Sequence, residues 1–324
     1  MAMTFYQQEA ANRRKSLLLI LIVGVLLGLL GFLVGYATSG SISGAAVITV
    51  GAVGLAGLLS AGSYFAGDSL VLAASQARPI GQADQPQLMN VVQELSLAAG
   101  VPPPNVYLID DSAPNAFATG RDPKHASVAV TSGLLQKLDR EELQGVIGHE
   151  LSHVRNFDIR FALLVAVLVG SIALISDLFL RGFLRVGLGG RGRDRGGAGI
   201  LILIVFVLAI LLAIVAPIFA RFVQLAVSRQ REYLADASSV ELTRNPAGLE
   251  QALVKIAMDR DVLEVANRAT QHLYFVNPIH KFEARASGLM ATHPPILDRI
   301  NRLRALHGAP PLGGAEAMTL AAVD

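Results

Sequence analysis

The sequence predicts a mostly α-helical, polytopic membrane protein with a small β-sheet. Of its 324 residues 52% are hydrophobic and only 16% are charged, which is too apolar for an ordinary soluble domain. Four apolar runs reach about the length that a bilayer core requires, and between them lie polar segments with helix and strand patterns. The runs are Ser16–Tyr36, Ala45–Leu72, Phe161–Leu180 and Ala198–Ala220.

The charge and the cysteine content narrow the classes of function. The net charge is +2 and the arginines lie beside hydrophobic runs rather than among aromatic residues, so nothing indicates a nucleic-acid partner. The absence of cysteine excludes disulfides and thiolate metal sites, and it suits a reducing cytosolic face. Any metal must therefore be held by His, Asp and Glu.

The first two apolar runs predict an N-terminal transmembrane hairpin over residues 1–72. Arg13, Arg14 and Lys15 precede the first run, as they would in a signal peptide. The run is longer than a signal-peptide core and a second one follows directly, so we interpret it as an uncleaved anchor. The positive-inside rule then places the N-terminus and the next polar segment in the cytoplasm.

Residues 73–160 form a polar segment with helix and strand signals. A helix is expected over 84–99, then strands over 105–111, 113–120 (an edge strand) and from 126, the last leading into a helix by 135. Asp139 and Glu142 have the form of a capping box, which starts a further helix. We expect that helix to continue without a stop into the apolar run at Phe161.

Residues 161–220 predict a second transmembrane or membrane-associated hairpin. The link between the two apolar runs of this hairpin contains five arginines, from Arg181 to Arg195, and a single acidic residue, Asp194. A full crossing would place them outside, against the positive-inside rule. Either the N-terminal spans dominate the orientation, or this hairpin does not fully cross. Residues 221–306 then form a second polar part with further helices, and 307–324 form a flexible tail.

The helix that follows Asp139 carries the pattern H-E-L-S-H. His149 and His153 lie one turn apart on the same helix face, so both rings can reach one metal ion. Imidazoles at this spacing bind Zn²⁺, and Glu150 lies close enough to take a proton from a water molecule there. The alternative is a surface helix with two solvated histidines.

A catalytic zinc site needs a third protein ligand. Glu232 and Asp236 in SRQREYLADASS are four residues apart and share a helix face. One carboxylate could bind the metal while the other accepts a hydrogen bond from a ligating imidazole. The apolar hairpin would return this helix beside the first. The alternative is a solvated helix in which Glu232 pairs with a nearby arginine. Asn156, three residues after His153, shares the expected metal face and could orient water or a ligand.

The order of these segments resembles the HtpX-type membrane zinc metalloproteases, which are relatives of the CaaX prenyl-protein proteases. The resemblance runs from about residue 14 to 306 through APNAFATG, VAVTSGLL, HELSHVRNFD, SRQREYLADASS and ATHPPILDRINRL. It implies a gluzincin-like catalytic domain formed by 73–160 and 221–306, with one Zn²⁺ per chain. It further implies that His149, His153 and Glu232 are the ligands, that Glu150 is the base and that Asp236 supports a ligand.

Two further positions follow from the resemblance, each with an alternative. His293 in THPP could donate to the oxyanion of the tetrahedral intermediate. It could equally be a residue at a helix start before two prolines. Asn115 in PNAFA could present an edge strand that pairs with an extended substrate. It could also simply form a turn after proline.

We therefore predict a zinc endopeptidase of the prokaryotic cytoplasmic membrane, with its catalytic domain facing the cytoplasm. The resemblance implies that it degrades misfolded or damaged membrane proteins, as part of stress-response quality control. Its partners would be unfolded polypeptide segments and the bilayer; no oligomeric state is predicted. One alternative is the processing of prenylated proteins. This role requires a hydrophobic chamber that can hold a lipid chain, and four spans are fewer than we would expect for such a chamber. The other is a non-catalytic, zinc-stabilised scaffold with Asp236 or His293 as fourth ligand.

Overall fold

The chain folds into two compact units. One comprises Met1–Asn12, Ala66–Leu163 and Leu225–Asp324, and the other comprises Arg13–Phe65 and Leu164–Gln224. The computed structural model describes residues 41–164, 229–259 and 294–313, with Asp261, Leu263 and separate residues between Arg14 and Phe32. The sheet and the helices around it belong to the first unit.

Helix α2 (Ile42–Ala74) is the candidate membrane span among the described residues, and no other described helix is long and apolar enough. Its 33 residues extend about 50 Å, which exceeds the roughly 30 Å of a bilayer core. Apolar side chains such as Val47 and Leu58 are each 73% exposed, as expected for a surface that faces lipid. The helix contains the predicted run Ala45–Leu72. The other three predicted runs lie largely or wholly outside the described residues.

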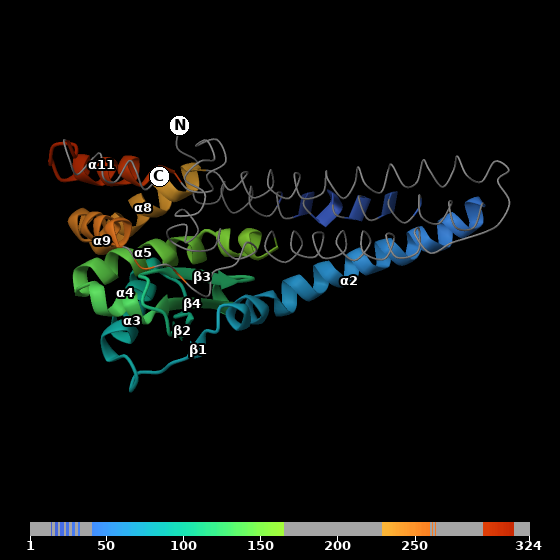
Figure 1. The fold of residues 1–324 in the computed structure, drawn as a ribbon, viewed down its shortest axis with the longest axis horizontal. Helices are drawn as coiled ribbons and strands as arrows, with labels where there is room; N and C mark the ends of the chain where they lie inside the picture. The colour runs from blue at the N-terminus through green and yellow to red at the C-terminus, as the bar shows by residue number, and fades with distance from the viewer. Residues whose placement is uncertain are drawn as a thin grey trace. The chain divides into compact units, whose positions relative to one another are not determined.

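The first unit contains a four-stranded mixed sheet (Figure 1). Strands β2 and β4 are parallel, and β3 pairs antiparallel with β4 at one edge, with Ala118 opposite Val128. The strand predicted over 113–120 therefore forms at an edge, as expected. The two-residue strand β1 was not predicted, because it is too short to carry an alternating pattern. The strands are β1 (Arg78–Pro79), β2 (Asn105–Ile109), β3 (Ala116–Gly120) and β4 (Ala126–Thr131), in the order β1-β2-β4-β3.

Within the described residues six α-helices accompany the sheet, which confirms a mostly helical chain with a small sheet. They are α3 (Pro86–Ala99), α4 (Ser132–Lys137), α5 (Arg140–Arg155), α8 (Arg229–Thr243), α9 (Pro246–Met258) and α11 (Ile296–Leu306). The capping box of Asp139 and Glu142 is present at the start of α5. Helix α3 ends at Gly100, whose φ of 68° is the left-handed conformation that glycine adopts at low cost.

The expectation of one uninterrupted helix from 140 into the apolar run is wrong. Helix α5 ends at Arg155, and Asn156 and Phe157 form a turn before the chain becomes helical again over 158–164. Phe157 has a φ of 58°, which is incompatible with a continuous right-handed helix. The apolar periodicity on both sides concealed this break in the sequence.

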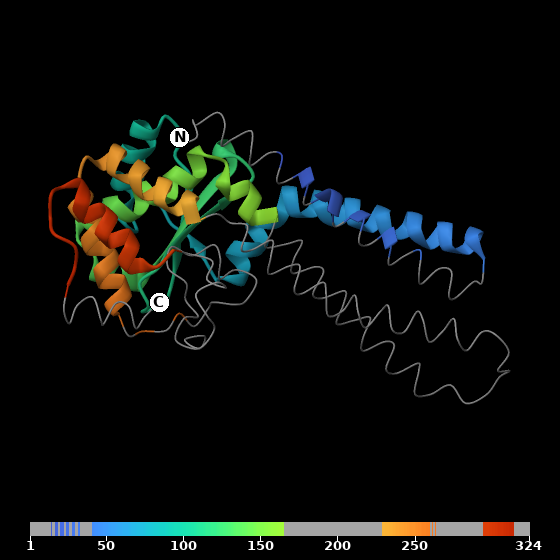
Figure 2. The same ribbon diagram turned by 90° about the horizontal axis from the view of Figure 1, so that it is seen from above.

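Helix α5 is the central element of the first unit and contacts β3, α3, α8 and α9 (Figure 1; Figure 2). Two glycines allow the close approach. A Cβ atom on Gly145 would lie 2.7 Å from the Cα of Leu249 in α9, and one on Gly148 would lie 2.9 Å from Oγ of Ser239 in α8. The Ser239 hydroxyl also donates to the Gly145 carbonyl over 2.6 Å. These contacts fix α8 against α5 although they are far apart in sequence.

Candidate metal centre

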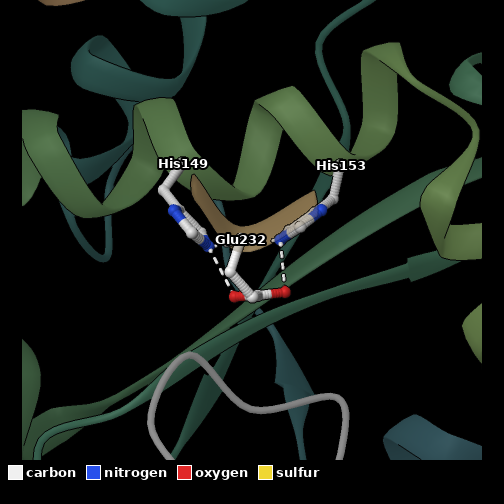
Figure 3. A group of neighbouring side chains, drawn as sticks. All are labelled: His149, His153 and Glu232. Atoms are coloured by element: carbon white, nitrogen blue, oxygen red, sulfur yellow. Dashed lines mark hydrogen bonds and ion pairs between the residues drawn. The ribbon is translucent and has the colours of Figure 1, made fainter. Parts of the chain in front are cut away.

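Three side chains from α5 and α8 converge at the centre of the first unit. Figure 3 shows the rings of His149 and His153 pointing from α5 toward the carboxylate of Glu232 on α8. The Nε2 atoms of the two histidines are 3.1 Å apart. Oε2 of Glu232 is 3.5 Å from Nε2 of His149, and its Oε1 is 3.7 Å from Nε2 of His153. These residues could hold a metal ion.

The donor set fits zinc in its spacing and in its chemistry. Ligand atoms about 2.1 Å from a tetrahedral zinc ion lie roughly 3.4 Å from one another, close to the three separations here. Nδ1 of His149 lies 2.9 Å from Oδ1 of Asp236, and Nδ1 of His153 lies 3.1 Å from Oδ2 of Asp158. A carboxylate accepts, so each Nδ1 carries the proton. When the two imidazoles are neutral, their Nε2 lone pairs are then left to face Glu232, as a metal site requires.

Asp236 is itself held by Arg299 of α11. The guanidinium donates from Nη2 to Oδ1 over 2.7 Å and from Nε to Oδ2 over 2.9 Å. Both side chains are buried, and Arg299 is only 2% exposed. Burial raises the pKa of Asp236, but the charge of Arg299 and the hydrogen bonds from His149 and Arg299 outweigh it and leave this pKa below its ordinary value. Asp236 is therefore ionised and can accept from His149.

Without a metal ion, the carboxylates around His153 favour the protonated form of its imidazole. Burial lowers the pKa of this imidazole, but the hydrogen bond to Asp158 and the negative charges of Glu232, Asp158 and Glu150 raise it to about 9. A bound cation would replace the proton in this role, because ligand imidazoles must be deprotonated. The electrostatics of the cluster therefore favour a cation of some kind at its centre.

Glu150 is buried beside the cluster and contacts the edge strand. The backbone N–H of Ala118 in β3 donates to its carboxylate. Burial raises the pKa of Glu150, and the nearby charge of Glu232 raises it further. The charges of His149 and His153, with the bond from Ala118, oppose that rise without cancelling it. A carboxylate with a raised pKa is suited to accept and then return a proton near neutral pH.

The remaining residues singled out from the sequence lie around this centre or outside the described residues. Asn115 is buried just before β3, where its Oδ1 accepts from the N–H of Ala116 over 3.0 Å and its own N–H donates to Thr131 over 2.9 Å. Asn156 ends α5, and its amide donates to Ser152 over 3.3 Å. It is not one of the three converging donors. His293 lies outside the described residues.

Two residues support the histidines in a way that was not predicted from the sequence: Asp158 contacts His153, and Arg299 holds Asp236 beside His149. Asp158 reaches His153 because the turn at Phe157 folds it back, and its other oxygen accepts from Nη1 of Arg231 over 3.3 Å. For Arg299 the sequence does contain a pattern that indicates a buried charge. It stands in the apolar stripe of its helix between buried Ile296 and Ile300, and a charge in such a stripe indicates a buried ion pair.

Comparison with known proteins places the chain in a family. The family described as Peptidase family M48 matches residues 82–307. The chain is 42% identical to the Protease HtpX homolog of Thermoanaerobacter pseudethanolicus, over 94% of this chain and 98% of that protein. It is 44% identical to the homolog of Streptococcus uberis, over 92% and 99% of the two chains. No solved structure matches the chain. The chain therefore belongs to peptidase family M48, among the HtpX-type proteases.

Proposed function

We propose that this protease is a membrane-bound zinc endopeptidase that hydrolyses unfolded segments of membrane proteins at the cytosolic face. The observation that carries the proposal is the convergence of two Nε2 atoms and one carboxylate within 4.8 Å. A buried glutamate with a raised pKa lies next to them. A closed structural zinc site would not need this glutamate.

His149, His153 and Glu232 would hold the ion, with Asp236 and Asp158 fixing the two rings so that Nε2 faces it. Zn²⁺, when bound, supplies Lewis acidity that acidifies water and polarises a carbonyl. The chain supplies the proton transfers. Glu150 accepts a proton from the water whose oxygen bonds to the carbonyl carbon. It then returns that proton to the amide nitrogen as the C–N bond breaks.

The edge strand supports a preference for unfolded substrates. Among the described strands β3 pairs with β4 alone, and its Ala118 N–H points to Glu150 rather than to β4. An extended peptide beside β3 would pair with its backbone and present a peptide bond to the glutamate. The backbone of a folded segment is largely paired within its own structure and is therefore not available for this pairing. In this arrangement Asn115 would fix the start of the strand, and we propose His293 as a donor to the oxyanion.

The membrane context supports the choice of substrate. Helix α2 is long and apolar enough to cross a bilayer. The basic residues before the first apolar run favour a cytoplasmic N-terminus. We propose transmembrane or membrane-associated hairpins at 1–72 and 161–220, with 73–160 and 221–306 as the catalytic domain. The substrates within reach would then be cytosolic loops of damaged membrane proteins.

The test measures bound zinc and cleavage of reduced, unfolded casein by the full chain in detergent. Glu150→Gln is expected to bind about one zinc per chain and to lose cleavage by at least a thousandfold. Glu241→Gln, an exposed change on α8, is the matched control and should behave as the parent. If the parent binds zinc yet cuts neither casein nor a prenylated peptide, the zinc-stabilised scaffold replaces the protease mechanism. Cleavage of the prenylated peptide alone would favour the processing role.

A further inference from the structure

The first unit contains a pocket, and none of its lining residues is one of the three candidate metal ligands. This pocket has a volume of about 710 Å³. It is formed where the end of α3, the turn between β3 and β4, and the end of α5 meet, and the lining residues include Val101, Lys124, Arg155 and Phe157. The proposed peptidase mechanism makes no use of it.

The pocket is basic. Lys124 is exposed and forms no ion pair within the described part of the chain, and Arg155 lines the same space. The acid among the lining residues, Asp122, is already compensated. Its Oδ1 accepts from the backbone N–H of Lys124 over 2.9 Å and of His125 over 3.1 Å, and it lies 2.8 Å from Nδ1 of His125. Lys124 and Arg155 are the two cationic side chains among the lining residues, and they make the pocket favourable for an anion.

A third basic residue, Arg160, contacts the lining residue Phe157. Nε of Arg160 donates to the backbone carbonyl of Arg121 over 2.6 Å. The Arg160 guanidinium also lies 5.0 Å from the ring centre of Phe157, within cation–π distance. Arg160 therefore adds positive charge near Phe157, which lines the pocket together with Lys124 and Arg155.

The pocket also has an apolar wall close to the start of a predicted membrane segment. Val101 and Pro102 line it together with Phe157, and Leu97 in the last turn of α3 is 85% exposed. Phe157 stands four residues before Phe161, the first residue of the apolar run, or about 6 Å at the rise of a helix. Basic side chains next to exposed apolar ones at such a position are typical of sites that contact anionic lipid.

We propose that this pocket binds the phosphate group of an anionic membrane phospholipid. Lys124 and Arg155 would contact the phosphate oxygens, with the arginine fork suited to two of them. Val101, Pro102 and Phe157 would contact the glycerol and the first methylenes of the acyl chains. A free phosphate ion would use the two cations but leave the apolar wall in water, which is why the lipid is the better occupant. Because Arg155 is two residues after His153, the lipid would hold the end of the helix that carries H-E-L-S-H.

The absence of tryptophan from the chain allows a direct test. Leu97→Trp introduces a single exposed fluorophore two residues before Ala99, which lines the pocket. The full chain in detergent is titrated with brominated phosphatidylglycerol or brominated phosphatidylcholine, which quench tryptophan on contact. The test variant adds Lys124→Gln and Arg155→Gln. The matched control instead adds Arg140→Gln and Arg244→Gln, which remove two charges elsewhere on the same unit. Bound zinc and thermal unfolding establish that both variants are folded.

Phosphatidylglycerol is expected to quench at a concentration about 25-fold lower than phosphatidylcholine, about fivefold for each of the two basic residues. This preference should weaken about fivefold for each charge removed from the pocket and stay unchanged in the control. Equal quenching by the two lipids, or an undiminished preference in the pocket variant, would overturn the proposal. A third arm adds 10 mM inorganic phosphate, roughly a physiological upper concentration, to the phosphatidylglycerol complex. Complete displacement would assign the pocket to a soluble anion and likewise overturn the lipid assignment, whereas retained quenching supports it.

Discussion

The guanidinium of Arg299 donates two hydrogen bonds, of 2.7 and 2.9 Å, to the carboxylate of Asp236. This carboxylate in turn lies 2.9 Å from the imidazole of His149. The guanidinium comes from α11, 63 residues further along the chain than the carboxylate. All three side chains are buried. The last described helix therefore contributes to the proposed metal site without contacting the proposed ion.

Loss of Arg299 should weaken metal binding and the fold together. Arg299→Ala leaves the Asp236 carboxylate buried without its cation, which costs about 3–5 kcal/mol of unfolding free energy. It also loosens the ring of His149, and we expect zinc affinity to fall about 10- to 100-fold. Thermal unfolding and competition with a chelator measure the two effects.

Arg302→Ala on the same helix is the control, because it removes only a cation–π contact at 3.7 Å from the Tyr233 ring. The double change Arg299→Met with Asp236→Leu separates the two effects of the ion pair. It should recover stability relative to Arg299→Ala while zinc affinity stays low. Zinc affinity equal to that of the parent in Arg299→Ala would contradict the positioning role of the pair.

Zinc affinity should depend steeply on pH through His153. Its pKa in the metal-free protein is about 9, so a proton competes with the ion below that pH. Apparent zinc affinity is therefore expected to rise about tenfold per pH unit between roughly pH 6.5 and 8.5. Asp158→Asn removes the hydrogen bond and a negative charge that raise this pKa, so the same dependence should move to lower pH. An affinity that does not vary over this range would contradict the prediction.

The same pKa predicts an opposite trend for the stability of the metal-free protein. The folded pKa of about 9 lies above the ordinary histidine value of 6.5, so the proton on His153 stabilises the folded state. This contribution is fully present below about pH 6.5 and is lost as pH rises through about 9. Chelator-treated protein should therefore lose stability between these pH values, and His153→Gln should reduce that loss. Thermal unfolding in detergent at a series of pH values measures it.

Local patterns in the sequence are sufficient to predict much of this structure. The capping box fixes the start of α5, and the spacing within H-E-L-S-H puts both rings on one face. Glu232 could be named because a returning hairpin would bring α8 beside α5. The contact of Asp158 with His153 and that of Arg299 with Asp236 could not be predicted in this way. The first depends on the left-handed backbone of Phe157, and the second depends on the packing of α11 against α8 and α9.

Gly145 should tolerate no side chain, although it lies inside a helix. Alanine at a free helical position stabilises by about 1 kcal/mol relative to glycine. At Gly145, however, the new Cβ would lie 2.7 Å from backbone atoms of Leu249, and α9 would have to move. We expect Gly145→Ala to lower the unfolding free energy by about 1–3 kcal/mol. Gly54→Ala in α2 is the control, because no atom lies within 4 Å of its Cβ position. Equal stability of the two variants would contradict the close approach.

Replacing Ala118 by proline should separate substrate pairing from folding. The N–H of Ala118 donates to Glu150, so it faces away from β4, and its neighbours in the strand supply the ladder donors. Proline is tolerated at such an edge position. We therefore expect Ala118→Pro to fold and to retain zinc.

Cleavage of casein by this variant should nevertheless fall at least about tenfold, since the proline ring occupies the edge of β3 along which the substrate would lie and Glu150 loses its hydrogen bond from Ala118. This hydrogen bond lowers the pKa of Glu150, so the acid limb of the pH–rate profile should move to higher pH. Thr119→Pro is the control: its N–H faces β4, and its loss should destabilise the sheet itself. Full activity of Ala118→Pro with an unchanged pH profile would mean that substrate does not bind along β3. The preference for unfolded segments would then need another structural basis, because strand pairing at this edge is what requires the substrate to be extended.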